Sequence, residues 1–137
     1  MNRQEKTRKV VETAKKYLEV PYKRNAKFYE APHFFNCSTF TRFVYEKIGK
    51  DLPKKAITQS MQGRKVKAKN IKIGDLVFIR GNRGYYNSQF PDGIGHVGIY
   101  VGENKIISAR GRYKKVTEEK LKNYLKKEQF RVIKRFL

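Results

Sequence analysis

The sequence has few of the residues that define several common protein classes. It contains one cysteine and two histidines in 137 residues. A single cysteine excludes an intramolecular disulfide, and structural zinc sites generally need four ligands in close pairs. We therefore expect no disulfide framework, no metal site and no other cofactor.

Long apolar runs are also missing. The first 20 residues are charged throughout, without the apolar centre of a secretory signal, and no later run is long enough to span a bilayer. We expect no transmembrane segment. The localisation stays open, because the protein is either cytoplasmic as written or exported by a non-classical route.

Acidic residues are scarce: 12 Asp and Glu stand against 33 Lys and Arg, a net charge of +21. The excess is spread along the whole chain rather than gathered in one block. Such a field attracts polyanions, anionic cell-wall polymers among them, without selecting one. Zinc-finger, RNA-binding and phosphate-loop motifs are missing, so we expect no specific nucleic-acid partner.

Length and hydrophobic content indicate one folded domain. Hydrophobic residues make up 39% of the chain, and neither an internal repeat nor a low-complexity linker interrupts it. A chain of this size can bury a real core. We expect residues 1–137 to form a single domain.

Apolar spacing predicts an α+β fold. Residues 10–18 carry a stripe at helical spacing, and Thr117 is a candidate cap for a short helix with Glu118 and Glu119 in its first turn. Short apolar runs between turn residues are typical of an antiparallel sheet. The predicted strands are 76–79, 97–101, 106–109 and about 130–136.

The only cysteine opens an amphipathic segment. Asn36 is a good N-cap, Gly49 is a plausible stop, and apolar residues between them recur at helical spacing, at Phe40, Phe43, Val44 and Ile48. Cys37 then lies in the first turn, where free N–H groups and the helix dipole favour a thiolate over a thiol. The alternative is that Cys37 is simply a small buried hydrophobe.

One histidine, His96, begins an apolar segment that predicts a strand, residues 95–102. A thiol and an imidazole on two different elements suggest a cysteine nucleophile with a histidine base. The other histidine, His33, follows a proline and precedes two phenylalanines, so we expect it in a loop packed onto the core, as a structural or cleft-wall residue.

Five stretches of the chain, in order, resemble the NlpC/P60 family of papain-like cysteine peptidases. The resemblance implies a papain-like α+β fold, in which a helix bearing Cys37 packs on an antiparallel sheet carrying His96. It also implies that Cys37 is the nucleophile, His96 the base, and Tyr22, Asn36 and Ser38 part of the substrate or oxyanion site. The matching stretches are Val20-Pro21-Tyr22, Asn36-Cys37-Ser38, Leu52-Pro53 with Gln59, 73–78 and 95–102.

The chain departs from the family pattern at three places. Asn36 stands where the family usually has aspartate, and the basic stretch 23–27 replaces an aromatic residue and two glycines. Ser108 falls where a third polar residue, commonly histidine, orients the base. A serine hydroxyl accepts a hydrogen bond but carries no charge to stabilise an imidazolium. A backbone carbonyl or another side chain is the alternative orienter.

The segment 80–95 leads into His96 and is longer than most loops in compact domains. We interpret it as a cleft lid in which Tyr85 or Tyr86 contacts substrate, the alternative being an exposed loop without a function.

These observations predict a hydrolase that cleaves amide bonds of peptidoglycan-type cell-wall peptides through a thioester acyl-enzyme. Acyl transfer on the same scaffold is one alternative. A non-catalytic basic module that binds polyanions is the other, and it is compatible with the departures at Asn36, 23–27 and Ser108.

Overall fold

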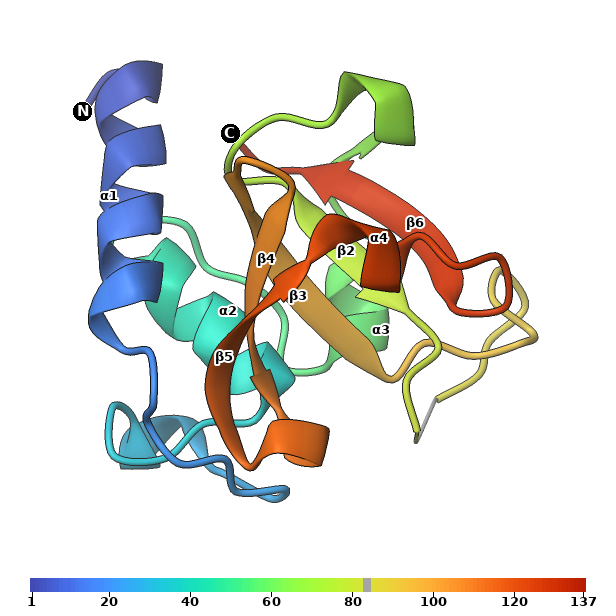
Figure 1. Cartoon of the computed structure of the whole chain (residues 1–137), viewed down its shortest axis with the longest axis horizontal. Coiled ribbons are helices and arrows are strands. Elements are labelled where there is room, and N and C mark those ends of the chain that lie inside the picture. The colour runs from blue at the N-terminus through green and yellow to red at the C-terminus, as the bar shows by residue number, and fades with distance from the viewer. Residues whose placement is uncertain (83–84) are drawn as a thin grey trace.

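A six-stranded antiparallel sheet forms the centre of the molecule in the computed structural model, which describes residues 1–82 and 85–137 (Figure 1). The strand order is β1-β6-β2-β3-β4-β5, and every neighbouring pair is antiparallel. The strands are β1 (Arg64–Val66), β2 (Leu76–Ile79), β3 (His96–Gly102), β4 (Lys105–Arg110), β5 (Lys115–Lys120) and β6 (Phe130–Arg135).

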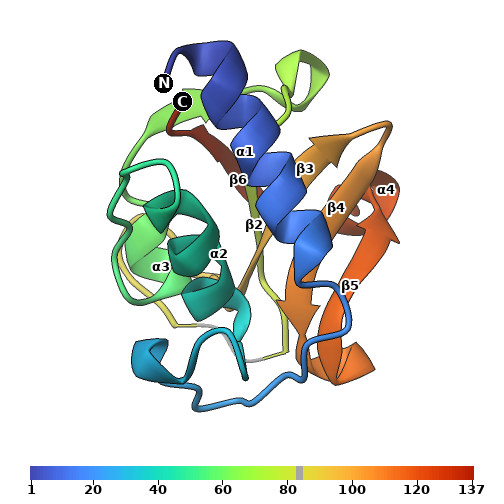
Figure 2. The same ribbon diagram turned by 90° about the vertical axis from the view of Figure 1, so that its left-hand side faces the viewer.

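Helices cover both faces of this sheet. Three lie on one face: α1 (Arg3–Lys16), α2 (Cys37–Glu46) and the single-turn α3 (Ala56–Gln59). Figure 2 shows α1 crossing in front of the sheet with α2 beside it. The short α4 (Leu121–Tyr124) packs on the opposite face, and three 3-10 turns complete the helices, Phe28–Glu30, Ala68–Asn70 and Gly111–Tyr113. Within the described residues, none of the helices has the length and apolar content to cross a membrane.

The two faces of the sheet bury separate apolar clusters. Alternate strand residues point to opposite faces, so neighbours in sequence join different clusters. Phe78 and Val97 belong to the larger cluster under α1 and α2, whereas Val77 and Ile79 belong to the smaller one under α4. This alternation determines which face each functional side chain reaches.

Most predicted elements are confirmed, and the mixed helical and antiparallel architecture agrees with the α+β prediction. The apolar stripe of residues 10–18 lies largely in α1, and the capped helix that begins at Cys37 is α2. The predicted strands match β2, β3, β4 and β6 to within one residue or two at their ends.

The helix predicted after Thr117 is wrong. Residues 115–120 form β5, which pairs with the whole of β4, from Lys105 opposite Lys120 to Arg110 opposite Lys115. The ladder offers these residues a hydrogen-bonding partner that their local sequence does not reveal, and helical structure starts only at Leu121. Glu119 consequently points into the protein, where it is buried.

Candidate active site

Cys37 is the first residue of α2 and lies against the start of β3. Its sulfur is 3.9 Å from the Gly95 carbonyl oxygen and accepts a hydrogen bond from the backbone N–H of Val97. These two backbone groups flank His96 in sequence. The N-terminus of the helix that carries the thiol therefore lies beside the start of the strand that carries the imidazole.

Burial determines the protonation of Cys37. The desolvation of the sulfur raises the thiol pKa above its ordinary value, against the opposite effects of nearby backbone N–H groups and of Arg110. The lowered pKa expected from the helix N-terminus is thus wrong in direction for the protein without substrate. The helix dipole is present, but the loss of water costs the thiolate more.

His96 is buried on the face of the sheet that α4 covers. Its Nε2 atom lies 3.1 Å from Ser108 Oγ and 2.9 Å from Tyr124 Oη. Desolvation, followed by the positive charge of Arg110, lowers the His96 pKa well below its ordinary value. Cys37 and His96 are therefore both uncharged at neutral pH before substrate binds.

Tyr124 is the site residue that sequence reasoning missed. It lies on α4, 28 residues from His96, and its hydroxyl is 2.8 Å from Ser108 Oγ. The only local signal is its spacing of three residues from the apolar Leu121, which predicts burial for a residue that also bears a hydroxyl.

The three residues expected to bind substrate or the oxyanion all line one cleft with Cys37. Tyr22 lies close enough for the Cys37 charge to affect its hydroxyl, whose pKa is raised chiefly by burial. The Asn36 side chain caps α2: Oδ1 accepts the Thr39 N–H at 2.9 Å and the Ser38 hydroxyl at 3.2 Å. Its amide also donates to a carbonyl of the basic stretch 23–27, that of Arg24, at 3.2 Å.

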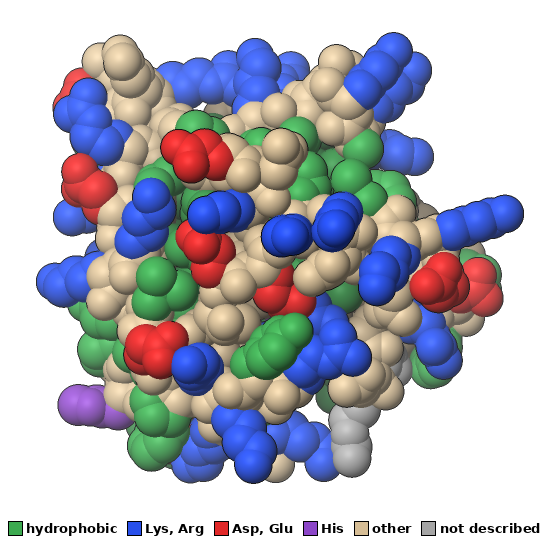
Figure 3. Space-filling model, in the orientation of Figure 1, with side chains coloured by type: hydrophobic (Ala, Val, Ile, Leu, Met, Phe, Trp, Pro, Cys, Tyr) green, Lys and Arg blue, Asp and Glu red, His purple; other side chains and the backbone are tan. Residues whose placement is uncertain are grey.

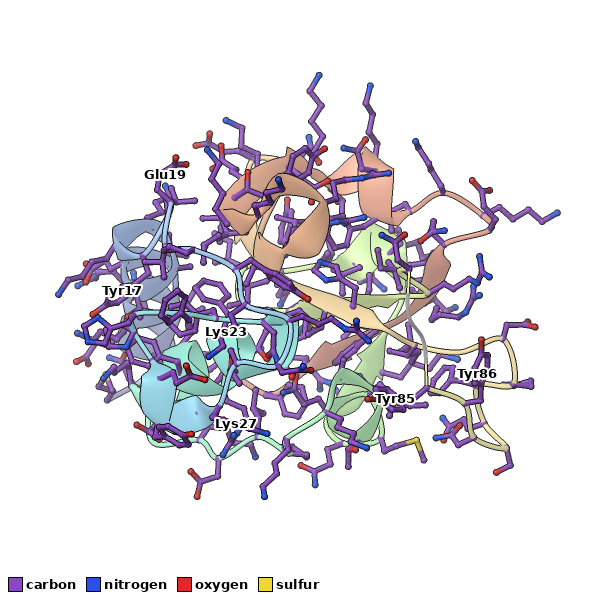
Figure 4. All side chains as sticks on the ribbon, turned by 90° about the horizontal axis from the view of Figure 1, so that it is seen from below. Tyr17, Glu19, Lys23, Lys27, Tyr85 and Tyr86 are labelled. Carbon is purple, nitrogen blue, oxygen red and sulfur yellow. The ribbon has the colours of Figure 1, made fainter. Side chains whose placement is uncertain are left out.

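The cleft has a volume of about 940 Å³ and a basic lining. Five cationic side chains line it, and the described residues contribute no carboxylate; the cations are Arg24, Lys27, Arg42, Lys54 and Lys55. Tyr85 and Tyr86 also reach the cleft, and Lys55 lies over the Tyr85 ring. In Figure 4, Tyr85 lies beside α3, whereas Lys27 comes from the loop before α2.

Part of the predicted lid, Arg83 and Gly84, lies outside the described residues. The described part of the segment is anchored at both ends, because Tyr85 and Ile94 exchange backbone hydrogen bonds and Gly95 donates to the Ile79 carbonyl.

Other candidates lie apart from this cleft. His33 is exposed and does not line it, so the expected packing onto the core is wrong; the neighbouring Phe35 occupies the buried position instead.

A second hollow of about 980 Å³, beside α1, contains none of the predicted site residues. Within residues 1–82 and 85–137, His, Cys, Asp and Glu side chains do not gather in threes as metal ligands would.

The chain is similar to known proteins over nearly its whole length. The sequence model of the NlpC/P60 family matches residues 20–135. The gamma-DL-glutamyl hydrolase of Bacillus subtilis is 35% identical over 128 residues, 93% of this chain and 29% of that protein. The probable endopeptidase p60 of Listeria grayi is 35% identical over 71% of this chain and 17% of its own length. This chain thus spans less than a third of either relative.

Solved structures share the fold. The NlpC/p60 domain of the peptidoglycan hydrolase SagA matches with a TM-score of 0.73 and 27% identity, over 95% of this chain and 98% of that domain. An NlpC/P60 protein from Bacillus cereus matches with a TM-score of 0.80 and 24% identity, over 96% of this chain and 40% of that one.

Proposed function

Because this chain belongs to the NlpC/P60 family, we propose that it is a cysteine hydrolase that cleaves amide bonds of cell-wall peptides, with Cys37 as nucleophile and His96 as base. The observation that carries the proposal is the meeting of two elements, since the Cys37 sulfur contacts the backbone on both sides of His96. Ser108 supports the base through its hydroxyl, 3.1 Å from Nε2.

The reaction begins with a neutral thiol and a neutral imidazole. Two hydroxyls engage Nε2, which leaves Nδ1 of His96 to take the thiol proton as the sulfur attacks the amide carbonyl. The carbon–nitrogen bond then breaks, and His96 gives its proton to the leaving amine. Water attacks the resulting thioester, its proton passes through His96 to the sulfur, and the acid is released.

The oxyanion that forms on the carbonyl oxygen needs donors. The backbone N–H of Cys37 belongs to the first turn of α2 and has no partner within that helix. Tyr22 lines the same cleft, and its raised pKa keeps the phenol protonated and able to donate. Asn36 and Ser38 support this site by fixing the first turn of α2.

The lining of the cleft favours an acidic substrate. Its five cations and lack of described carboxylates would attract peptides that carry several carboxylate groups. The similarity to a gamma-DL-glutamyl hydrolase points to the same chemistry, an amide bond next to glutamate with a free carboxylate at each residue. Peptidoglycan peptides and glutamyl polymers both contain such groups, and electrostatic association with anionic wall polymers would follow from the same cations.

The described part of the predicted lid, residues 80–82 and 85–95, is proposed to cover one side of this cleft, with Tyr85 or Tyr86 in contact with substrate. Tyr85 and Tyr86 are both more than half exposed although they line it, so a bound peptide could cover their rings. Aromatic rings at such positions bury a large apolar area when a ligand binds.

The test combines one substitution at the nucleophile with one measurement on the native enzyme. Cys37→Ala should reduce hydrolysis of a γ-glutamyl peptide to background while leaving the unfolding midpoint nearly unchanged, because the sulfur is a minor part of the core. Mass spectrometry of the native enzyme, quenched in acid during turnover, should detect the acyl group on Cys37. Full activity in Cys37→Ala would refute the proposed nucleophile.

A further inference from the structure

A chain of buried polar groups extends from His96 across three other elements. Tyr124 on α4 lies 2.9 Å from His96 Nε2, and Glu119 on β5 accepts a hydrogen bond from the Tyr124 hydroxyl at 3.3 Å. Arg110 on β4 pairs with the same Glu119 oxygen at 3.3 Å. Ser108, also on β4, bonds both His96 and Tyr124.

The proton count of these groups gives the chain a direction. Tyrosine and serine each have one hydroxyl proton, neutral imidazole has one N–H, and an ionised carboxylate has none. Tyr124 donates its hydroxyl proton to Glu119, which leaves the Tyr124 oxygen to accept, so Ser108 donates to Tyr124 and His96 donates from Nε2. The series ends on Glu119, because only this group lacks a proton to pass on.

Glu119, where this series of hydrogen bonds ends, is unusual because it is a buried carboxylate. Its side chain is 4% exposed, and its second oxygen, Oε2, is a buried atom with no hydrogen-bond partner among the described residues. Buried carboxylates are normally fully hydrogen-bonded, and each exception calls for an explanation. A role in stabilising a positive charge that forms on His96 would explain the burial of the Glu119 carboxylate.

We propose that Tyr124 and Glu119 are the positioning pair for His96, Tyr124 holding the Nε2–H and Glu119 stabilising the imidazolium through the Tyr124 hydroxyl. The inference rests on the proposed hydrolase function. The pair supplies the negative charge that Ser108 lacks, since a serine orients the ring but is itself neutral. Hydrogen bonds that end on an ionised group are about twice as strong as neutral ones.

Charges of both signs lie near His96. Ser108 and Tyr124 contact its Nε2, Cys37 lies against the backbone beside it, and Arg110 on β4 and Glu119 on β5 pair with each other beyond Tyr124. The positive charge of Arg110 opposes an imidazolium, and Glu119 is the carboxylate that pairs with Arg110. Glu119 is thus the only described anion in the group.

The fold leaves room for Tyr124 at one glycine. A Cβ atom on Gly98, two residues after His96, would lie 2.4 Å from Ile106 Cγ2 and 3.1 Å from a Tyr124 ring carbon. Real Cβ atoms do not approach as closely as 2.4 Å, so a side chain at residue 98 would displace Ile106, and the Tyr124 ring would have to shift by a few tenths of an ångström as well.

The experiment compares two variants with matched controls. Tyr124→Phe removes one buried hydroxyl, and Glu119→Gln removes one buried charge while keeping the side-chain shape. Tyr45→Phe is the control for the first, because the buried Tyr45 hydroxyl bonds Gly74 on another part of the fold. Glu118→Gln is the control for the second, because Glu118 is the more exposed neighbour on β5 and pairs with Lys105.

The first measurement is steady-state hydrolysis. We expect kcat to fall by about 10- to 100-fold in each test variant, with KM changed much less, since the lost interaction is with a charge that forms during reaction. Both controls should keep the native kcat.

The second measurement needs no substrate. The chain has only two histidines, so a nitrogen NMR titration resolves His96 with the exposed His33 as internal reference. The native protein should show His96 protonated on Nε2. In both test variants the His96 pKa should fall further, because the imidazolium loses its stabilising carboxylate, whereas His33 should not change.

The outcomes separate this inference from the proposed function. If kcat and the His96 titration are native in both test variants while Cys37→Ala is inactive, the positioning pair is refuted and the hydrolase stands. If Cys37→Ala is active, the hydrolase proposal fails. Should Tyr124→Phe fail to fold, which a thermal melt would detect, Glu119→Gln provides the same two readouts.

Discussion

At the residue scale, burial sets the charge state of the reacting groups. The desolvation that raises the Cys37 pKa also lowers the His96 pKa, because in each case it penalises the charged form. A thiolate and an imidazolium before substrate binds would both carry that penalty. The proposed mechanism therefore has the sulfur attack the substrate carbonyl as the proton moves to His96, rather than as a thiolate formed beforehand.

This charge state predicts a broad pH profile. Hydrolysis needs a neutral His96 and one proton on the Cys37 thiol, so activity is lost when His96 gains a proton or Cys37 loses one. A lowered His96 pKa moves the acid limb of kcat/KM below pH 6.5, and a raised Cys37 pKa moves the alkaline limb above pH 9.0. Rates measured in constant-ionic-strength buffers would check this. An acid limb above pH 6.5 would contradict the prediction.

At the element scale, the loop before α2 and the turn after it fix the nucleophile. Asn36 caps the helix and donates to the Arg24 carbonyl, while the buried Gln59 donates to the carbonyls of Ser38 at 3.2 Å and Pro53 at 2.9 Å. These bonds connect the cysteine helix to its flanking segments on both sides. The predicted N-cap is confirmed, and the Asn36 side chain is hydrogen-bonded both to its own helix and to the preceding loop.

Replacing the cap should cost stability. Asn36→Ala removes the acceptor for the Thr39 N–H and leaves first-turn donors without a partner, at a cost of about 0.5–2 kcal/mol in the free energy of unfolding. Urea unfolding measures this loss. Asn25→Ala, at an exposed position in the preceding loop, is the control and should leave the midpoint within error. Equal midpoints for the two variants would show that the cap contributes nothing.

At the scale of the whole molecule, positive charge surrounds the protein. Figure 3 shows Lys and Arg side chains spread over the visible face, where they outnumber the acidic ones between them. A net charge of +21 raises the encounter rate with any anion, but only the cations that line the cleft lie beside a bound substrate. The attraction due to the net charge and that due to the cleft cations can therefore be compared by removing one lysine charge at each of two places.

Two lysines offer that comparison. Lys54→Gln and Lys122→Gln lower the net charge equally, but Lys54 lines the cleft and Lys122 lies on α4. For an acidic γ-glutamyl peptide, Lys54→Gln should lower kcat/KM about fivefold, the effect of about 1 kcal/mol between charges about 4 Å apart in water. Added salt should narrow the difference. The same loss in both variants would argue against a substrate site for these cations.

The sequence alone predicts most of the elements and the candidate reactive pair. Helical spacing after Asn36 locates α2, alternating apolar runs locate four of the strands, and short motifs single out Cys37 and His96. These features are legible because each depends on residues close together in the chain. The helix predicted after Thr117 is wrong because residues 115–120 pair with β4, and this pairing is not encoded in the local sequence.

The pKa directions of Cys37 and His96 and the contacts around His96 depend on the assembled fold. The pKa direction of Cys37 depends on how much water the fold removes, which the first turn of a helix does not reveal. Tyr124 reaches His96 across 28 residues, and Glu119 joins it because β5 turns that carboxylate inward. Desolvation and long-range contact arise from packing, and packing is a property of the assembled fold rather than of any local stretch of sequence.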